Sequence, residues 1–117
     1  MTMKKIKVKS SSIIYEPEAD TLSIRFNDRK TDYGVNFEDL LIIDVTEGNR
    51  LAGVEYLGVS EWFDIDKTQL SNIDRLEIKV SYNEESKEFR IVAEIGIKDK
   101  EEKIVMQPLK LEEPIIV

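Results

Sequence analysis

The sequence predicts an α+β domain that is predominantly antiparallel β, with one short helix near residues 66–74. Three observations support this. Apolar and polar residues alternate with a period of two over much of the chain, as they do in half-buried strands. Turn-forming residues separate these runs. A helix-capping pattern occurs between Asp66 and Gln69. We expect two hairpins followed by a three-stranded meander, all within a single domain spanning residues 1–117.

The first hairpin is predicted between residues 13 and 26. Its second strand places Leu22, Ile24 and Phe26 on one face and polar residues on the other. The connecting segment, residues 16–20, reads EPEAD. Proline presets φ for the second position of a tight turn, and aspartate tolerates the left-handed conformation. Turn chemistry alone therefore accounts for this acidic segment.

The second hairpin is predicted after a polar stretch, residues 29–39, which we expect to be a loop or an irregular edge. Residues 40–45 are apolar at nearly every position, as expected of a central strand. After a turn at residues 46–49, residues 50–60 are predicted to return as a strand. The two glycines in this strand indicate a bulge or a close backbone approach.

The short helix is predicted within residues 61–75, because Asp66 and Gln69 form a capping-box pair. Strict alternation resumes after it and continues to about residue 112. Residues 76–112 are therefore predicted to form the three-stranded meander. Pro108 has no backbone N–H to donate, so it confines the last strand to an edge position.

The composition excludes several kinds of site. Histidine and cysteine are both absent, which removes disulfides, thiolate metal sites, cysteine nucleophiles and imidazole bases. The 24 acidic and 17 basic residues give a net charge of −7, which disfavours duplex nucleic acid. No apolar run is long enough to span a bilayer. We expect a cytoplasmic protein without a cofactor, and its charge-rich composition resembles that of thermophile proteins.

Two groups of acidic residues are candidate sites. Glu16, Glu18 and Asp20 could offer carboxylate oxygens to a divalent cation, but their spacing is not that of an EF-hand and a structural turn explains them as well. Asp44 and Glu55 lie on neighbouring predicted strands. If close, they would have split pKa values suited to acid–base chemistry; the alternative is a pair of surface acids. Since no catalytic motif is present, we assign no catalytic residue.

Four apolar residues are interface candidates: Trp62, Ile115, Ile116 and Val117. An exposed tryptophan would be an anchor of the kind enriched in interface hot spots; the alternative is that Trp62 and Phe63 cap the core. The apolar end of the chain would be a liability in water and is predicted to pair with a strand or a second subunit. We therefore expect a homo-oligomer, most simply a two-fold dimer.

A series of motifs runs from residue 13 to residue 60. It comprises Tyr15-Glu16-Pro17-Glu18-Ala19-Asp20, an alternating strand, Ile42-Ile43-Asp44, Gly53-Val54-Glu55-Tyr56-Leu57 and Ser60. This series resembles the domain of unknown function 2283 family of small bacterial and archaeal proteins. Two positions depart from the family pattern: Glu16 stands where Asp is usual, and Gly48-Asn49 where Asp-Gly is common. The resemblance implies a double β-hairpin and supplies no activity.

These observations lead to three functional hypotheses. The first is a non-enzymatic protein-interaction or oligomerisation module. The habit of the resembled family suggests, as one form of it, the acidic member of a two-gene module such as a toxin–antitoxin pair, with a protein partner. The alternative is a domain that binds a small ligand or a divalent metal ion through an acidic rim. The third is a carboxylate-based hydrolase or isomerase.

Overall fold

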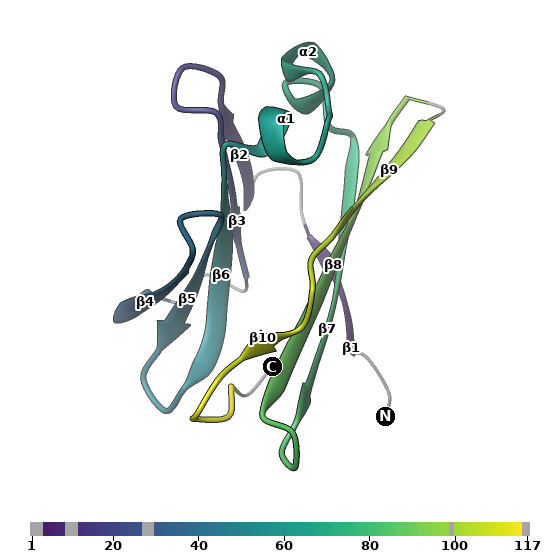
Figure 1. Cartoon of the computed structure of the whole chain (residues 1–117). Coiled ribbons are helices and arrows are strands. Elements are labelled where there is room, and N and C mark those ends of the chain that lie inside the picture. Colours follow the sequence, from purple (N-terminus) through teal and green to yellow (C-terminus); the bar gives the residue numbers. More distant parts are fainter. Residues whose placement is uncertain (1–3, 9–11, 27–29, 99, 116–117) are drawn as a thin grey trace.

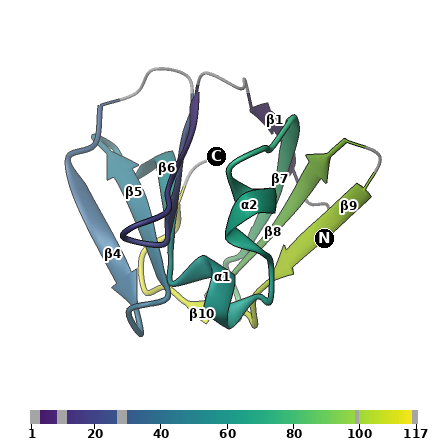
Figure 2. The same ribbon diagram turned by 90° about the horizontal axis from the view of Figure 1, so that it is seen from above.

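Two antiparallel β-sheets pack face to face in the computed structural model of the protein (Figure 1). The structure describes residues 12–26, 30–98 and 100–115, together with the backbone of residues 4–8. Figure 2 shows the two layers side by side, and Figure 1 shows the short helices at one end of the sandwich. The prediction of a predominantly antiparallel β protein is confirmed, while the α-helices among the described residues are two single turns.

Sheet 1 contains five strands from the first half of the chain. In spatial order they are β2 (Ile13–Glu16), β3 (Thr21–Arg25), β6 (Arg50–Leu57), β5 (Leu41–Thr46) and β4 (Tyr33–Phe37). The first predicted hairpin is confirmed, since Tyr15 pairs with Leu22. Strand β5 lies in the interior of the sheet, between β6 and β4, in agreement with its apolar sequence.

Strand β4 lies at the sheet edge, as one alternative for residues 29–39 expected, but it is a regular strand rather than an irregular one. Its backbone pairs regularly with β5, from Tyr33 opposite Val45 to Phe37 opposite Leu41. An edge strand has one neighbour and mostly exposed side chains. Its composition therefore looks like that of a loop, and the alternation that identifies half-buried strands is weak.

Sheet 2 is built mainly from the second half of the chain. Its strands are β1 (Lys4–Val8), β7 (Arg75–Asn83), β8 (Glu88–Ile97), β9 (Lys100–Val105) and β10 (Leu109–Lys110). The β7–β8–β9 meander is confirmed. Two strands are additional: β1 pairs with β7, and β10 pairs with β8 beyond the end of β9. Pro108 lies in the gap between β9 and β10, at the sheet edge as predicted.

Two single-turn helices replace the one predicted near residues 66–74: α1 (Val59–Trp62) and α2 (Lys67–Leu70). The capping box at Asp66 and Gln69 is confirmed. Helix α2 ends at Leu70, because the side chains of Ser71 and Asn72 donate hydrogen bonds back to the carbonyls of Lys67 and Thr68.

Helix α1 occupies residues that were expected to continue the strand of residues 50–60. Gly58 ends β6 in the left-handed region, at φ 60°, and is the N-cap of α1. The chain therefore turns away from sheet 1 toward sheet 2. Buried Val59 holds this turn against the core.

A continuous hydrophobic core fills the space between the sheets. The inward residues of sheet 1 include Leu22, Ile24, Leu41, Ile43, Val54 and Tyr56, each at most 1% exposed. Sheet 2 contributes Ile78, Phe89, Ile91 and Ile95, also at most 1% exposed. Helix α2 adds Leu70 to the same cluster. The alternation seen in the sequence thus corresponds to one buried and one outer face for each sheet.

Candidate functional site

The acidic turn between β2 and β3 holds Asp20 in a network of hydrogen bonds. Asp20 is 9% exposed and has φ 53°. Its carboxylate accepts hydrogen bonds from the Tyr15 hydroxyl at 2.6 Å, the Ser60 hydroxyl at 2.7 Å and the Ser60 amide at 3.1 Å. Its carbonyl accepts one from the Val59 amide at 3.1 Å. The turn is therefore tied to the start of α1.

These contacts determine the ionisation of Asp20. Burial by itself would raise the pKa of this carboxyl, but the hydrogen bonds from Tyr15 and Ser60, with Lys67 nearby, outweigh it and hold the pKa below its ordinary value. Burial and the Asp20 carboxylate raise the pKa of the Tyr15 hydroxyl. Asp20 is thus an ionised acceptor with its donors provided by the protein.

The other two acidic residues of this turn, Glu16 and Glu18, are exposed. In the part of the chain that the structure describes, no three acidic side chains come together in a way that could hold a metal ion. The oxygens of Asp20 face Tyr15 and Ser60. The arrangement accounts for the turn as a structural element.

The second pair of candidate acids, Asp44 and Glu55, does come together. Asp44 lies on β5 and Glu55 on β6, both on the outer face of sheet 1, and their side chains approach within hydrogen-bonding range. Asp44 is only 9% exposed, whereas Glu55 is half-buried. Burial first, and then Glu55, raise the pKa of Asp44 to about 7, while Arg25 opposes this shift.

Two glycines make room for the Asp44 side chain. Gly34 on β4 and Gly53 on β6 are its direct cross-strand neighbours. A Cβ at Gly34 would lie 3.6 Å from Asp44 Oδ1, and one at Gly53 would lie 3.5 Å from Oδ2. A Cβ at Gly53 would also come within 2.5 Å of the Ile24 carbonyl, so the predicted close backbone approach is confirmed.

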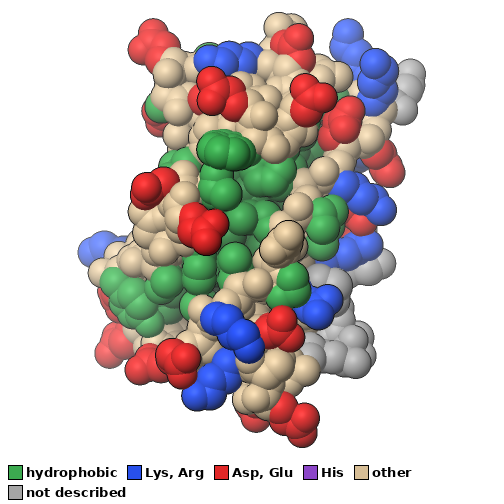
Figure 3. All heavy atoms as spheres, viewed as in Figure 1, with side chains coloured by type: hydrophobic (Ala, Val, Ile, Leu, Met, Phe, Trp, Pro, Cys, Tyr) green, Lys and Arg blue, Asp and Glu red, His purple; other side chains and the backbone are tan. Residues whose placement is uncertain are grey.

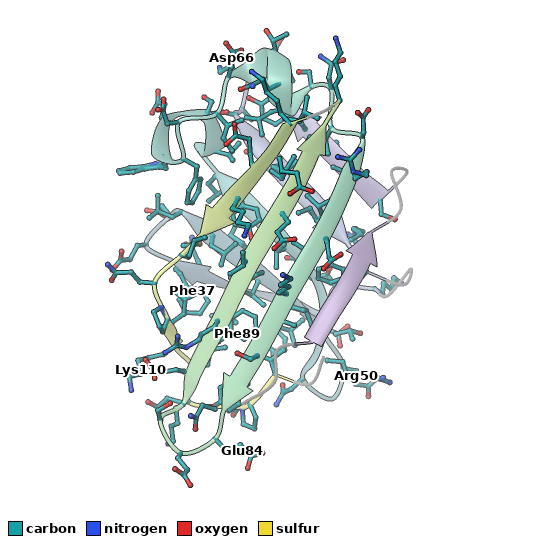
Figure 4. All side chains as sticks on the ribbon, turned by 90° about the vertical axis from the view of Figure 1, so that its right-hand side faces the viewer. Phe37, Arg50, Asp66, Glu84, Phe89 and Lys110 are labelled. Atoms are coloured by element: carbon teal, nitrogen blue, oxygen red, sulfur yellow. The ribbon has the colours of Figure 1, made fainter. Side chains whose placement is uncertain are left out.

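An apolar groove of about 570 Å³ opens between the two sheets along one edge of the sandwich. Sheet 1 lines it with Phe37, Glu38 and Leu40, α1 and the residue after it with Trp62 and Phe63, and sheet 2 with residues 105–110. Figure 3 shows hydrophobic side chains gathered between the two layers on this side. In Figure 4, Phe37 and Lys110 lie at the same edge of the molecule, although they come from different sheets.

Trp62 and Phe63 have different environments in this groove. Phe63 packs edge-to-face against buried Tyr56, with ring centroids 6.0 Å apart, so it covers the core. Trp62 is 64% exposed, and its indole lies over Gly58, where an added Cβ would be 2.9 Å from Trp62 Cδ1. Phe63 therefore caps the core, as one alternative expected of both residues, whereas Trp62 has the exposure that the other alternative required.

Of the C-terminal interface candidates, the structure describes Ile115 alone. Ile115 is 8% exposed and belongs to the core of its own chain, which favours the alternative that this part of the tail packs within the chain. The tail can reach this position because Leu111, four residues earlier, donates its amide to the Lys87 carbonyl. Ile116 and Val117 lie outside the described residues.

Sequence reasoning missed most of the groove and the partners of Asp20. The groove residues Phe37, Met106 and Leu109 come from distant segments, and nothing in their local sequence joins them. Ser60 closes the motif series, and its forty-residue separation from Asp20 concealed the contact. For Asp44, the sequence did contain a signal, because Gly34 and Gly53 on the neighbouring strands leave room for its side chain.

The comparisons with known proteins agree with the motifs. A family described as Protein of unknown function (DUF2283) matches residues 12–60. No curated protein and no solved structure matches the chain. Among the described residues, the helices are too short to cross a membrane. Residues 12–60, which form sheet 1 and the first residues of α1, match the model of this family, as the motif series predicts.

Proposed function

We propose that the protein is a non-enzymatic interaction module that associates with a second copy of itself across the groove. The observation that carries this proposal is Trp62, a large side chain 64% exposed at the mouth of an apolar groove. Exposed tryptophans beside apolar pockets are the typical anchors of protein interfaces. Covering Trp62, Phe37 and Met106 would remove an apolar surface that monomeric proteins seldom leave in water.

The dimensions of this face suit a dimer. The molecule extends over 39 × 26 × 25 Å, and the groove runs between the sheets on one of its long faces. A stable interface needs about 800 Å² from each partner. A face of these dimensions can provide that area without involving either sheet's outer surface.

The rims of the groove carry opposite charges. Glu38 lies on the rim formed by sheet 1, and Lys110 on the rim formed by sheet 2. A two-fold axis parallel to the groove places each rim against the opposite rim of the other copy. Glu38 of each copy then faces Lys110 of the partner subunit, and the symmetry creates two such contacts.

The hypothesis of a metal-binding domain lacks a comparable observation. The described residues form no cluster suited to a metal ion. The more specific expectation of the acidic member of a toxin–antitoxin pair has no structural feature in its support and is not included in the proposal.

Sedimentation velocity over a range of protein concentrations tests this proposal. We expect the wild type to dimerise and Trp62→Glu to weaken dimerisation at least about thirtyfold, as for a hot-spot residue. The control is Ile14→Glu, which places the same charge at a side chain 55% exposed on β2, outside the groove, and should leave the dimer intact. A wild type that stays monomeric at about 100 µM, or equal effects of the two variants, would contradict the proposal.

Charge reversal tests the orientation of the two copies. Glu38→Lys should weaken the dimer about two- to tenfold, because it places two positive rims together. Adding Lys110→Glu in the same chain should restore the wild-type affinity. If the double variant is weaker than either single one, the axis does not run parallel to the groove.

A further inference from the structure

The outer face of sheet 1 brings two carboxyl groups together in an arrangement that the groove does not use. The strand register places Arg25, Gly53, Asp44 and Gly34 in one cross-strand row. Ser23, Glu55, Ile42 and Asn36 form the next row. Asp44 and Glu55 are thus diagonal neighbours on paired strands, close enough for direct contact.

Contact between these two groups requires a proton. An ionised carboxylate can only accept hydrogen bonds, so two carboxyl groups can bond to each other only while one of them is protonated. Two ionised carboxylates at that separation repel each other strongly. The diagonal placement of Asp44 and Glu55 on paired strands, with Asp44 only 9% exposed, suits a pair that shares one proton.

The two members of the pair differ in their freedom. Asp44 is fixed, because it is 9% exposed and its two oxygens lie over Gly34 and Gly53. Glu55 is half-buried and has a longer side chain that can turn toward solvent. Loss of the proton can therefore be relieved by movement of Glu55 alone, with no change in the strands.

The charged groups around Asp44 set the local balance of charge. Glu55 faces it from β6 and Arg25 from β3. Strand β4 presents Gly34 and the uncharged Asn36 on this face, with Asp32 just before the strand. With one shared proton, Asp44, Glu55 and Arg25 have a net charge of zero. Without it, their net charge is −1.

We propose that Asp44 and Glu55 form a proton-operated switch on the outer face of sheet 1. In the protonated state the two carboxyl groups are joined and the surrounding surface is electrically balanced. In the deprotonated state Glu55 turns outward, Asp44 remains beside Arg25, and the face gains one exposed negative charge. The surface that the protein presents to a charged partner therefore depends on pH.

Carboxyl-detected NMR titration of the full chain tests the switch. In the wild type, we expect the Asp44 carboxyl carbon to titrate near pH 7, with the side-chain signals of Glu55 shifting at the same midpoint. In Glu55→Gln the like charge is gone, and the Asp44 midpoint should fall by at least about one pH unit. Glu77→Gln, which changes a half-buried acid on β7 in the other sheet, is the matched control and should leave it unchanged.

The results separate proton sharing from simple burial. If Asp44 keeps the same midpoint in Glu55→Gln, burial alone holds its proton and the switch is wrong. An Asp44 that titrates below about pH 5 in the wild type overturns it as well. Glu55 signals that do not move at the Asp44 midpoint contradict the outward turn. Folding of each variant is checked by the core methyl resonances.

Discussion

At the scale of single residues, Asp20 shows how an acid in a turn can act as a structural connector. We expect Asp20→Ala to lower the free energy of unfolding by about 2–4 kcal/mol, because it leaves the Tyr15 hydroxyl and the Ser60 amide without their acceptor. Urea denaturation at pH 7 measures this change. The control is Glu18→Ala in the same turn, which removes an exposed carboxylate and should cost no more than about 0.5 kcal/mol. Equal losses in the two variants would contradict a connecting role for Asp20.

The same residue shows what a sequence reveals about a site. The proline and acids of the EPEAD segment identify the turn, since their preferences are local. The partner of Asp20 is Ser60, forty residues along the chain, and only the fold brings the two together. The sequence predicts that Asp44 and Glu55 lie near each other, because both fall on adjacent predicted strands. Whether their side chains meet depends on the register of the two strands, which the structure provides.

At the scale of elements, the transition from β6 to α1 depends on Gly58. We expect Gly58→Ala and Gly48→Ala each to lower the free energy of unfolding by about 1–2 kcal/mol, because both glycines have positive φ. Only Gly58→Ala should also displace the Trp62 indole, which its Cβ would meet at 2.9 Å; nothing lies within 4 Å of a Cβ at Gly48.

Trp62 is the only tryptophan, so its fluorescence reports this displacement directly. The emission spectrum should change in Gly58→Ala and stay as in the wild type in Gly48→Ala. Sedimentation should show weaker self-association for Gly58→Ala alone. Unchanged emission in Gly58→Ala would mean that the indole does not depend on the glycine for its position.

Element prediction succeeded for strands with a clear apolar pattern and failed for β4 and α1. The β2–β3 hairpin and the meander of sheet 2 alternate cleanly, because one face meets the core. Edge strand β4 has mostly exposed side chains, and α1 is too short to show a helical period. The capping box of α2 was identifiable because its two hydrogen bonds are local.

At the scale of the whole molecule, two acids give opposite dependences of stability on pH. The pKa of Asp20 is lowered by folding, so its contribution is present above its unfolded pKa and is lost as pH falls through the folded value. The pKa of Asp44 is raised to about 7, so its contribution is fully present below the unfolded value of about 4 and is lost as pH rises toward 7. Together they favour greatest stability at mildly acidic pH.

Urea denaturation from pH 3 to pH 8 measures both effects. Relative to the wild type, Asp44→Asn should gain stability between about pH 4 and pH 7, by at most about 1.4 kcal/mol per pH unit. Asp20→Asn should lose the steep fall of stability at acidic pH. If the difference between the wild type and Asp44→Asn is constant over this range, the proton on Asp44 is not linked to folding.

The match to residues 12–60 ends where sheet 1 ends, so the layer that covers its inner face comes from other parts of the chain. Leu22, Ile24, Ile43 and Val54 depend on that layer to stay dry. A polypeptide with the matched segment alone would have to obtain such a layer from another molecule, and its stability would vary with concentration. Here the cover is covalently attached, which makes burial of this face an intramolecular event that dilution cannot reverse.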